Sequence, residues 1–202
     1  MWRIGVTGSI ATGKSTVLEA FKALGVPVFS ADAAVAELYA GAAVAPVEAL
    51  FPGVAVNGVI DKAQLAQRLA ADPARFQQLE AVVHPLVRNR IIRFIEQAER
   101  SGAALAVVEV PLLFEGGHDY GFDAVAVTHV AEPIQRARAL ARPGMSVDKL
   151  DAILARQLPQ AEKKARATYV FDTGGTINQT ADAVKALVTS IQARQDRNDA
   201  TQ

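Results

Sequence analysis

The stretch GSIATGKST at residues 8–16 constrains the fold of this chain more than any other segment. It follows the apolar run WRIGV at 2–6 and precedes a segment whose apolar residues have helical spacing. The pattern G-x-x-x-x-G-K-[ST], which marks a phosphate-binding loop between a strand and a helix, is satisfied by Gly8, Gly13, Lys14 and Ser15. In such a loop, backbone N–H groups surround a polyphosphate and the positive end of the helix dipole faces it. The stretch therefore predicts a nucleotide site, and the alternative is a glycine-rich turn with a solvated lysine.

The side chains of Lys14 and Ser15 suit different parts of a bound nucleotide. The ammonium group of Lys14 would neutralise the β- and γ-phosphates, and the Ser15 hydroxyl would bind the Mg²⁺ that bridges them. The glycines allow a close backbone approach that a Cβ would block. We therefore expect a nucleotide and Mg²⁺ at this loop.

Five short runs of apolar and β-branched residues are separated by longer segments of helical pattern. The runs lie at residues 2–7, 26–30, 104–110, 123–130 and 168–172. Strands that are apolar on both faces are typical of a parallel sheet covered by helices. The sequence thus predicts an α/β fold, a P-loop NTPase domain with a five-stranded parallel sheet flanked by helices.

Two longer segments interrupt this pattern. Residues 31–102 contain no predicted strand; their apolar side chains recur at helical spacing, with helix starts expected at Asp61 and Asp72 and a stop at Gly102. Residues 135–166 hold eight basic and three acidic side chains, so their local charge is positive. Both segments are predicted to be helical insertions into a nucleotide-binding core that comprises residues 1–30, 103–134 and 167–202.

The charge balance excludes a general electrostatic attraction to polyanions. Lys plus Arg and Asp plus Glu both total 21, so the formal net charge is zero, and we expect no nucleic-acid partner and no membrane association. The basic segment 135–166 leaves nucleic-acid binding as an alternative. The chain has no cysteine, which excludes disulfides and thiolate metal sites, and no apolar run of about 18 residues. These features favour a cytoplasmic location.

Two carboxylates are candidates for a role beside the nucleotide. Asp32 follows the run VPVFSA, so we expect it at the carboxyl edge of the sheet, where open α/β sheets bind ligands. There it could orient a substrate hydroxyl towards the γ-phosphate, or it could cap the helix that follows. Glu109 lies near the end of ALAVVEV, where it could assist Mg²⁺ and its waters or cap a loop.

Longer stretches resemble the dephospho-CoA kinase family over nearly the whole chain. The matching pieces are TGSIATGKSTV at 7–17, LGVPVFSADAAVAEL at 24–38, LEAVVHPLV at 79–87, VEVPLLFE at 108–115, and RARALAR followed by ARQ at 155–157. The resemblance implies transfer of a phosphoryl group from ATP, with Mg²⁺, to the ribose 3′-hydroxyl of dephospho-CoA, giving coenzyme A and ADP. It also implies a helical CoA-binding domain at 31–102 and a lid at 135–166.

The resemblance also assigns roles to individual residues. The implied catalytic residues are Asp32 as the base, Lys14 and Arg142. The implied ATP-binding residues are Gly8, Ala11, Thr12, Gly13, Lys14, Ser15, Thr16, Arg138 and Arg142. The implied substrate-binding residues are Asp32, His84 and Arg88, and the implied metal ligands are Ser15 and Glu109.

The chain departs from the family's pattern at four places. Ser30 replaces the first Asp of an Asp-Ala-Asp triplet, and Glu109 stands where an Asp is usual. Ala11-Thr12 replaces the commoner Gly-Ser, so Ala11 must accept the backbone angles of the loop. Asp172-Thr173-Gly174 occupies the position of an Asn-x-Gly sequence near the adenine.

Alternatives stay open for several side chains and for the activity. His84, beside Pro85, could cap or pack a helix, and Arg88 could be solvated surface. Arg138 and Arg142 are four residues apart, so we expect them to share a helix face, where they could bind the transferring phosphoryl group or pair with local carboxylates. A kinase for another small molecule and a nucleotide-dependent switch are the competing functions.

Overall fold

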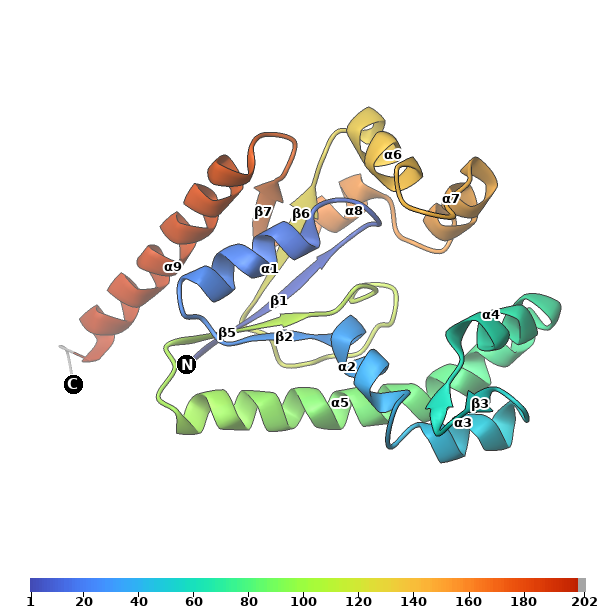
Figure 1. Cartoon of the computed structure of the whole chain (residues 1–202). Coiled ribbons are helices and arrows are strands. Elements are labelled where there is room, and N and C mark those ends of the chain that lie inside the picture. The colour runs from blue at the N-terminus through green and yellow to red at the C-terminus, as the bar shows by residue number, and fades with distance from the viewer. Residues whose placement is uncertain (200–202) are drawn as a thin grey trace. The chain divides into compact units, whose positions relative to one another are not determined.

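The computed structural model describes the backbone of residues 1–199 and the side chains of residues 1–194. The chain forms two compact units: a larger one that comprises Met1–Phe29 and the chain from Gln97 onward, and a smaller one that comprises Ser30–Glu96. Figure 1 shows the order of the helices and strands along the chain. Among the described residues, no helix combines the length and the apolar content that crossing a membrane requires.

The main sheet has five parallel strands in the order β2-β5-β1-β6-β7. The strands are β1 (Trp2–Gly8), β2 (Val28–Ser30), β5 (Leu105–Glu109), β6 (Ala124–His129) and β7 (Tyr169–Asp172). Each corresponds to one of the five runs predicted from the sequence, so the predicted fold class is confirmed. All residues of β5 are buried, as are Ile4 and Val6 of β1, which is why these strands lie inside the sheet rather than at its edge.

Helices α1 (Lys14–Ala23) and α9 (Ile177–Asp199) pack against one another in the larger unit (Figure 1). They share one apolar core with the sheet. Phe21 of α1 and Phe171 of β7 meet edge to face in this core, with ring centroids 6.1 Å apart. Gly25, with φ +75°, ends the turn after α1 as its position in the sequence predicts. Because Val17, Leu18 and Phe21 are buried in this core, α1 is anchored to the sheet directly after the glycine-rich loop.

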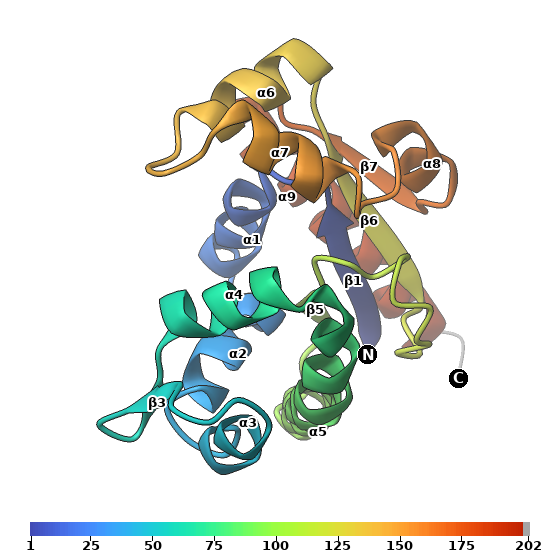
Figure 2. The same cartoon turned by 90° about the vertical axis from the view of Figure 1, so that its right-hand side faces the viewer.

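Three helices lie between β6 and β7: α6 (Glu132–Leu140), α7 (Val147–Leu154) and α8 (Gln160–Ala165). Figure 2 shows α6 and α7 side by side, and the two helices contact one another. The predicted insertion at 135–166 begins inside α6 and belongs to the larger unit. Its helical character is as predicted, and its role as a lid stays a prediction.

The smaller unit is mainly helical, as the sequence predicts. Its helices are α2 (Ala31–Leu38), α3 (Val44–Leu50), α4 (Lys62–Ala71), the 3₁₀ turn η1 (Pro73–Arg75) and most of α5 (Phe76–Arg100). Asp61 caps α4 by accepting hydrogen bonds from the N–H groups of Ala63 and Gln64, at 2.8 and 3.1 Å. Asp72 precedes η1, with Pro73 at the start of the turn, but its side chain makes no capping hydrogen bond.

The expectation that residues 31–102 contain no strand was wrong. An antiparallel hairpin joins β3 (Ala55–Val56) to β4 (Val59–Ile60). Its turn residues Asn57 and Gly58 have φ values of +52° and +79°, which suit the Asn-Gly turn of two-residue hairpins. The strands are too short for alternating hydrophobicity to reveal them, and the Asn-Gly pair was the signal that sequence reasoning overlooked.

Candidate active site

The glycine-rich loop at residues 8–16 connects β1 to α1 and has two left-handed residues. Ala11 has φ +60° and Gly13 has φ +82°. A side chain at residue 13 is excluded, because an added Cβ would lie 2.8 Å from Thr173 Oγ1. Ala11 does accept the backbone angles that a glycine usually supplies at its position. The loop thus keeps the curved shape of a phosphate-binding loop although glycine is absent from residue 11.

Hydrogen bonds of buried threonine hydroxyl groups hold the shape of the loop. The Oγ1 atoms of Thr12 and Thr128 are 2.7 Å apart, and Thr12 Oγ1 also lies 2.8 Å from the Ser9 carbonyl oxygen. Thr173 Oγ1 lies 2.9 Å from the Thr12 carbonyl oxygen. Thr12 is 1% exposed and its N–H donates to the Ser9 carbonyl oxygen at 3.3 Å, so Thr12 maintains the shape of the loop and does not line the cavity described below.

Lys14 begins α1, directly after the left-handed Gly13. Its ammonium group donates a hydrogen bond of 3.0 Å to the carbonyl oxygen of Gly8 at the other end of the loop. This contact holds the positive charge over the loop, beside the N-terminal end of α1, where backbone N–H groups and the helix dipole also favour an anion. The local charge is therefore suited to phosphate.

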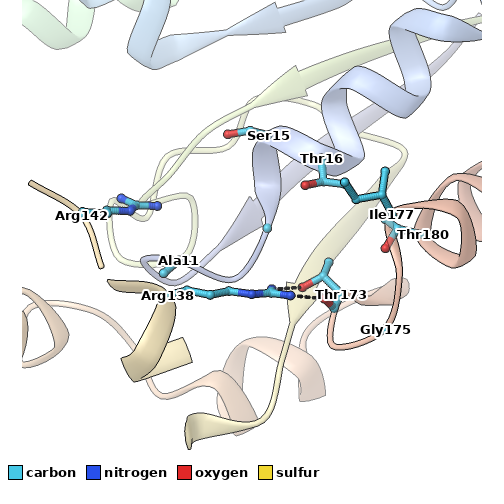
Figure 3. Close-up of a pocket in the computed structure, with 10 residues that line it drawn as sticks. Ala11, Ser15, Thr16, Arg138, Arg142, Thr173, Gly175, Ile177 and Thr180 are labelled. Carbon is cyan, nitrogen blue, oxygen red and sulfur yellow. Dashed lines mark hydrogen bonds between the residues drawn. The ribbon is translucent and has the colours of Figure 1, made fainter. Parts of the chain in front are cut away.

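A cavity opens in front of the loop (Figure 3). It is lined by Ala11, Gly13, Ser15, Thr16, Arg138, Arg142, Thr173, Gly175, Ile177 and Thr180. The structure therefore brings six of the residues implied for ATP binding together in one place. Sequence reasoning missed Gly175, Ile177 and Thr180, which come from the start of α9 and the loop before it. The Asp-Thr-Gly-Gly sequence at 172–175 was the available signal for this wall.

Arg138 and Arg142 both reach this cavity, and they do so differently. Arg138 lies in α6 and donates two hydrogen bonds to Thr173, to its carbonyl oxygen at 2.8 Å and to its Oγ1 at 3.3 Å (Figure 3). Arg142 lies beyond the last residue of α6, Leu140, so the two arginines do not share one helix face as expected. Arg138 thus links the two walls of the cavity, and Arg142 adds a second positive charge at its edge.

A second cavity adjoins the first at Gly175. It is lined by His129, Ala131, Ile134, Asp172, Gly174, Gly175 and Gln179. Asp172 Oδ1 accepts a hydrogen bond of 2.8 Å from the N–H of Gly174. This contact fixes the turn that separates the two cavities.

Glu109 ends β5, where its Cα pairs with that of Val6 in β1. The side chain is 3% exposed and does not line either cavity described above. The structure therefore places Glu109 at the end of its strand, as predicted, but outside the cavity in front of the loop.

The remaining predicted residues belong to the smaller unit. Ser30, and not Asp32, is the N-cap of α2, with its Oγ accepting from the N–H of Ala33 at 3.4 Å. The alternative role of Asp32 as the helix cap is therefore wrong, and its exposed carboxylate lies in the first turn of α2.

His84 and Arg88 lie one turn apart in α5, with His84 exposed and Arg88 half-buried. Because α5 continues through both residues, His84 does not cap a helix.

The comparisons with known proteins agree on one family. The dephospho-CoA kinase family matches residues 2–179 of this chain. A dephospho-CoA kinase from Rhodopseudomonas palustris (strain BisB18) is 50% identical over 190 residues, which cover 94% of each chain. A dephospho-CoA kinase from Brucella melitensis biotype 1 is 45% identical over 191 residues, which cover 95% of this chain and 96% of the relative.

Solved structures share the fold over the same length. The structure of a protein from Thermus thermophilus matches with a TM-score of 0.78 at 34% identity, and the match covers 94% of this chain and 97% of that chain. A dephospho-CoA kinase from Campylobacter jejuni has a TM-score of 0.65 at 22% identity, over 94% of this chain and 96% of that one. By the family match over residues 2–179 and the identity to these relatives, this chain belongs to the dephospho-CoA kinase family, whose members phosphorylate dephospho-CoA with ATP in the last step of coenzyme A biosynthesis.

Proposed function

We propose that this chain transfers the γ-phosphoryl group of ATP to the ribose 3′-hydroxyl of dephospho-CoA, with the triphosphate bound at residues 8–16. The observation that carries this proposal is the cavity in which the glycine-rich loop, Ser15 and two arginines meet. Backbone N–H groups and the ammonium of Lys14 hold the β- and γ-phosphates. Arg142 stabilises the negative charge that builds up on the phosphate oxygens during transfer, which makes its effect larger on turnover than on ATP affinity.

Ser15 is the proposed protein ligand of Mg²⁺. Its hydroxyl belongs to the first turn of α1 and faces the cavity beside Thr16 (Figure 3), and a hydroxyl oxygen is a suitable ligand for this ion. The ion, when bound with ATP, neutralises phosphate charge. Glu109 is buried and does not line the ATP cavity, so we propose that it would act on the ion through intervening water rather than as a direct ligand.

Asp32 is the proposed catalytic base. It follows β2 by two residues, and the carboxyl ends of parallel strands share one edge of the sheet, the edge at which β1 leads into the loop. Its carboxylate accepts the proton of the ribose hydroxyl and points the oxygen at the γ-phosphate. Because Ser30 caps α2, the carboxylate of Asp32 is not needed as the helix cap.

The two insertions have proposed roles in binding dephospho-CoA and in closing the site. Residues 31–102 form the CoA-binding part, in which His84 and Arg88 provide polar and positive groups for the anionic substrate. Residues 135–166 form the lid, and two of its basic side chains, Arg138 and Arg142, face the ATP cavity. We also propose a cytoplasmic location, because the reaction consumes ATP and the chain has no cysteine.

The position of phosphorylation tests the finer part of this proposal. Purified protein, ATP and Mg²⁺ are incubated with dephospho-CoA, and with adenosine monophosphate and shikimate as competing acceptors. Phosphorus and proton NMR of the product then identify the modified hydroxyl. We expect dephospho-CoA to be the preferred acceptor and its 3′-hydroxyl to carry the new phosphate. A preference for another acceptor, or a phosphate on another hydroxyl, would overturn the proposal.

A further inference from the structure

Ile10 is held on both sides by glutamines that come from outside the glycine-rich loop. The N–H of Ile10 donates a hydrogen bond of 3.0 Å to Oε1 of Gln157. The carbonyl oxygen of Ile10 accepts a hydrogen bond of 2.9 Å from Nε2 of Gln135. Gln135 lies in α6 and Gln157 follows α7, so both belong to the 135–166 segment. Two successive peptide groups of the loop are therefore fixed by this segment.

The orientation of Gln135 is set by a third glutamine. Gln160, at the start of α8, donates from Nε2 to Oε1 of Gln135 at 2.7 Å. Its own Oε1 accepts from the N–H of Val130 at 3.2 Å, directly after β6. Because the Oε1 of Gln135 is already an acceptor in this chain, its amide nitrogen is the atom that faces Ile10. Gln135 is only 3% exposed, so water does not readily replace it.

Apolar contacts reinforce the polar ones at the next residue. Ala11 packs in a buried cluster with Ala139 of α6 and Leu150 of α7. Ile10 is packed against the same cluster. Ala11 is also the residue with φ +60°, a backbone conformation that is sterically unfavourable for alanine. An unfavourable conformation persists only where its surroundings hold it, and here the two glutamines hold the residue just before it.

We infer that Gln135 and Gln157 are positioning residues for ATP. They fix the peptide groups on either side of Ile10, and this keeps Ala11 left-handed and the remaining N–H groups of the loop directed at the triphosphate. The inference rests on the proposed assignment of residues 8–16 as the ATP loop, and it does not depend on which acceptor the enzyme uses. Any lid motion that separates α6 or Gln157 from the loop must break these hydrogen bonds.

The same substitution at the two positions provides the test, because the two glutamines use opposite ends of their amide groups. Gln157→Glu keeps the oxygen that accepts from the Ile10 N–H, whereas Gln135→Glu replaces the nitrogen that donates to the Ile10 carbonyl. Both variants add one negative charge near the loop, so repulsion of the triphosphate acts in the same direction in both, and the uncharged Gln157→Leu shows the effect of losing the hydrogen bond without a new charge. ATP affinity is measured by calorimetry without acceptor, which separates the result from any failure of the dephospho-CoA assignment.

We expect Gln135→Glu and Gln157→Leu to weaken ATP binding about tenfold, the effect of one lost hydrogen bond, and Gln157→Glu to bind at least about fivefold more tightly than Gln135→Glu. In steady-state assays, KM for ATP should rise in the impaired variants while KM for dephospho-CoA stays constant. Hydrogen exchange at the Ile10 amide, followed by NMR, should accelerate in Gln157→Leu. The control is Arg136→Ala, which removes an exposed ion pair of 2.9 Å with Asp151 between α6 and α7 and leaves Ile10 untouched.

Three results would contradict the inference. They are equal ATP affinity in the two glutamate variants, unchanged affinity in Gln157→Leu, and a loss in Arg136→Ala as large as the loss in Gln157→Leu. If the buried Gln135→Glu change prevents folding, the comparison of Gln157→Leu with Gln157→Glu decides, since Gln157 is half-buried. Equal affinity in that pair would also count against it.

Discussion

Lys163 Nζ lies 2.7 Å from Glu115 Oε1, and the lysine side chain is completely buried. Glu115 follows β5, and Lys163 belongs to α8. The same carboxylate oxygen accepts a hydrogen bond of 2.8 Å from the N–H of Leu158, in the turn that leads into α8. One carboxylate therefore ties the end of the 135–166 segment to the loop after β5, close to the glutamines that hold the ATP loop.

Because of this ion pair, we expect the free energy of unfolding to vary with pH in the acidic range. Burial raises the pKa of Glu115, but the ion pair with Lys163 and the hydrogen bond from Leu158 together outweigh burial, so the pKa lies below its ordinary value of 4.5. A lowered pKa means that the carboxylate stabilises the fold fully above the ordinary value and progressively less as the pH falls through that value towards the lower one of the folded protein. We expect the difference in free energy of unfolding between the wild type and Glu115→Gln to be largest near neutral pH and to shrink below about pH 4.5. Urea unfolding at several pH values measures it, and a difference independent of pH would contradict the pairing.

Removal of Lys163 alone should lower the free energy of unfolding more than removal of both charges of the ion pair. Lys163→Met leaves the Glu115 carboxylate partly buried without its cation, and such a change costs about 3–5 kcal/mol. The double variant with Glu115→Gln keeps an oxygen for the Leu158 N–H and buries no charge, so it should recover more than half of that loss. Urea unfolding of the single and double variants provides the numbers. A double variant as unstable as Lys163→Met would show that the pair is not the cause.

Gly13→Ala should disturb the ATP loop through two separate effects. The left-handed φ costs about 1–2 kcal/mol for alanine, and the added Cβ would lie within 3.0 Å of three Thr173 side-chain atoms. Gly25→Ala is the matched control, because Gly25 has φ +75° at the other end of α1 and its Cβ would meet no atom within 4 Å. We expect Gly25→Ala to lose stability only, and Gly13→Ala to lose more stability and also ATP affinity. Similar ATP affinities in the two variants would contradict the assigned contact with Thr173.

Asp32→Asn should separate catalysis from binding. The asparagine cannot accept the proton of the ribose hydroxyl, so we expect kcat to fall by about 10²–10⁴ while ATP affinity and the free energy of unfolding change little. Ser30→Ala is the structural counterpart, since it removes the cap of α2 and should lower stability by about 0.5–1 kcal/mol with nearly normal kcat. Turnover of Asp32→Asn close to that of the wild type would remove Asp32 from the mechanism.

The five strands of the sheet could be predicted from the sequence, because strands that are buried on both faces consist of short, nearly continuous apolar runs. The loop at 8–16 was equally clear, since its glycine, lysine and serine residues have fixed spacing. The hairpin at 55–60 was not predicted, because strands of two residues are too short to show an alternating pattern. Gln135 and Gln157 escaped for another reason: their partner, Ile10, is more than 120 residues away along the chain, and a lone glutamine gives no sign of what it contacts.

The positions of the two arginines show how a small error in a helix end changes a site. Spacing of four residues predicts that Arg138 and Arg142 share a helix face. Because α6 ends at Leu140, Arg142 leaves the helix and approaches the cavity from its own direction, whereas Arg138 turns to Thr173. Six of the residues that line the cavity were predicted, but the directions of the two arginines depend on a helix end that the four-residue spacing ignores and that Pro143-Gly144 marks just after Arg142.

The transfer reaction itself is the most direct test of the function assigned to this chain. Purified wild-type protein is given ATP and Mg²⁺ with or without dephospho-CoA, ADP release is followed by a coupled assay, and coenzyme A is identified by mass spectrometry. Lys14→Ala, which removes the charge that neutralises the phosphates, serves as the impaired control, with turnover lowered about 100-fold or more. The account predicts ADP release that requires dephospho-CoA and matches the coenzyme A formed. ADP release that is the same without dephospho-CoA, or no formation of coenzyme A, would contradict it.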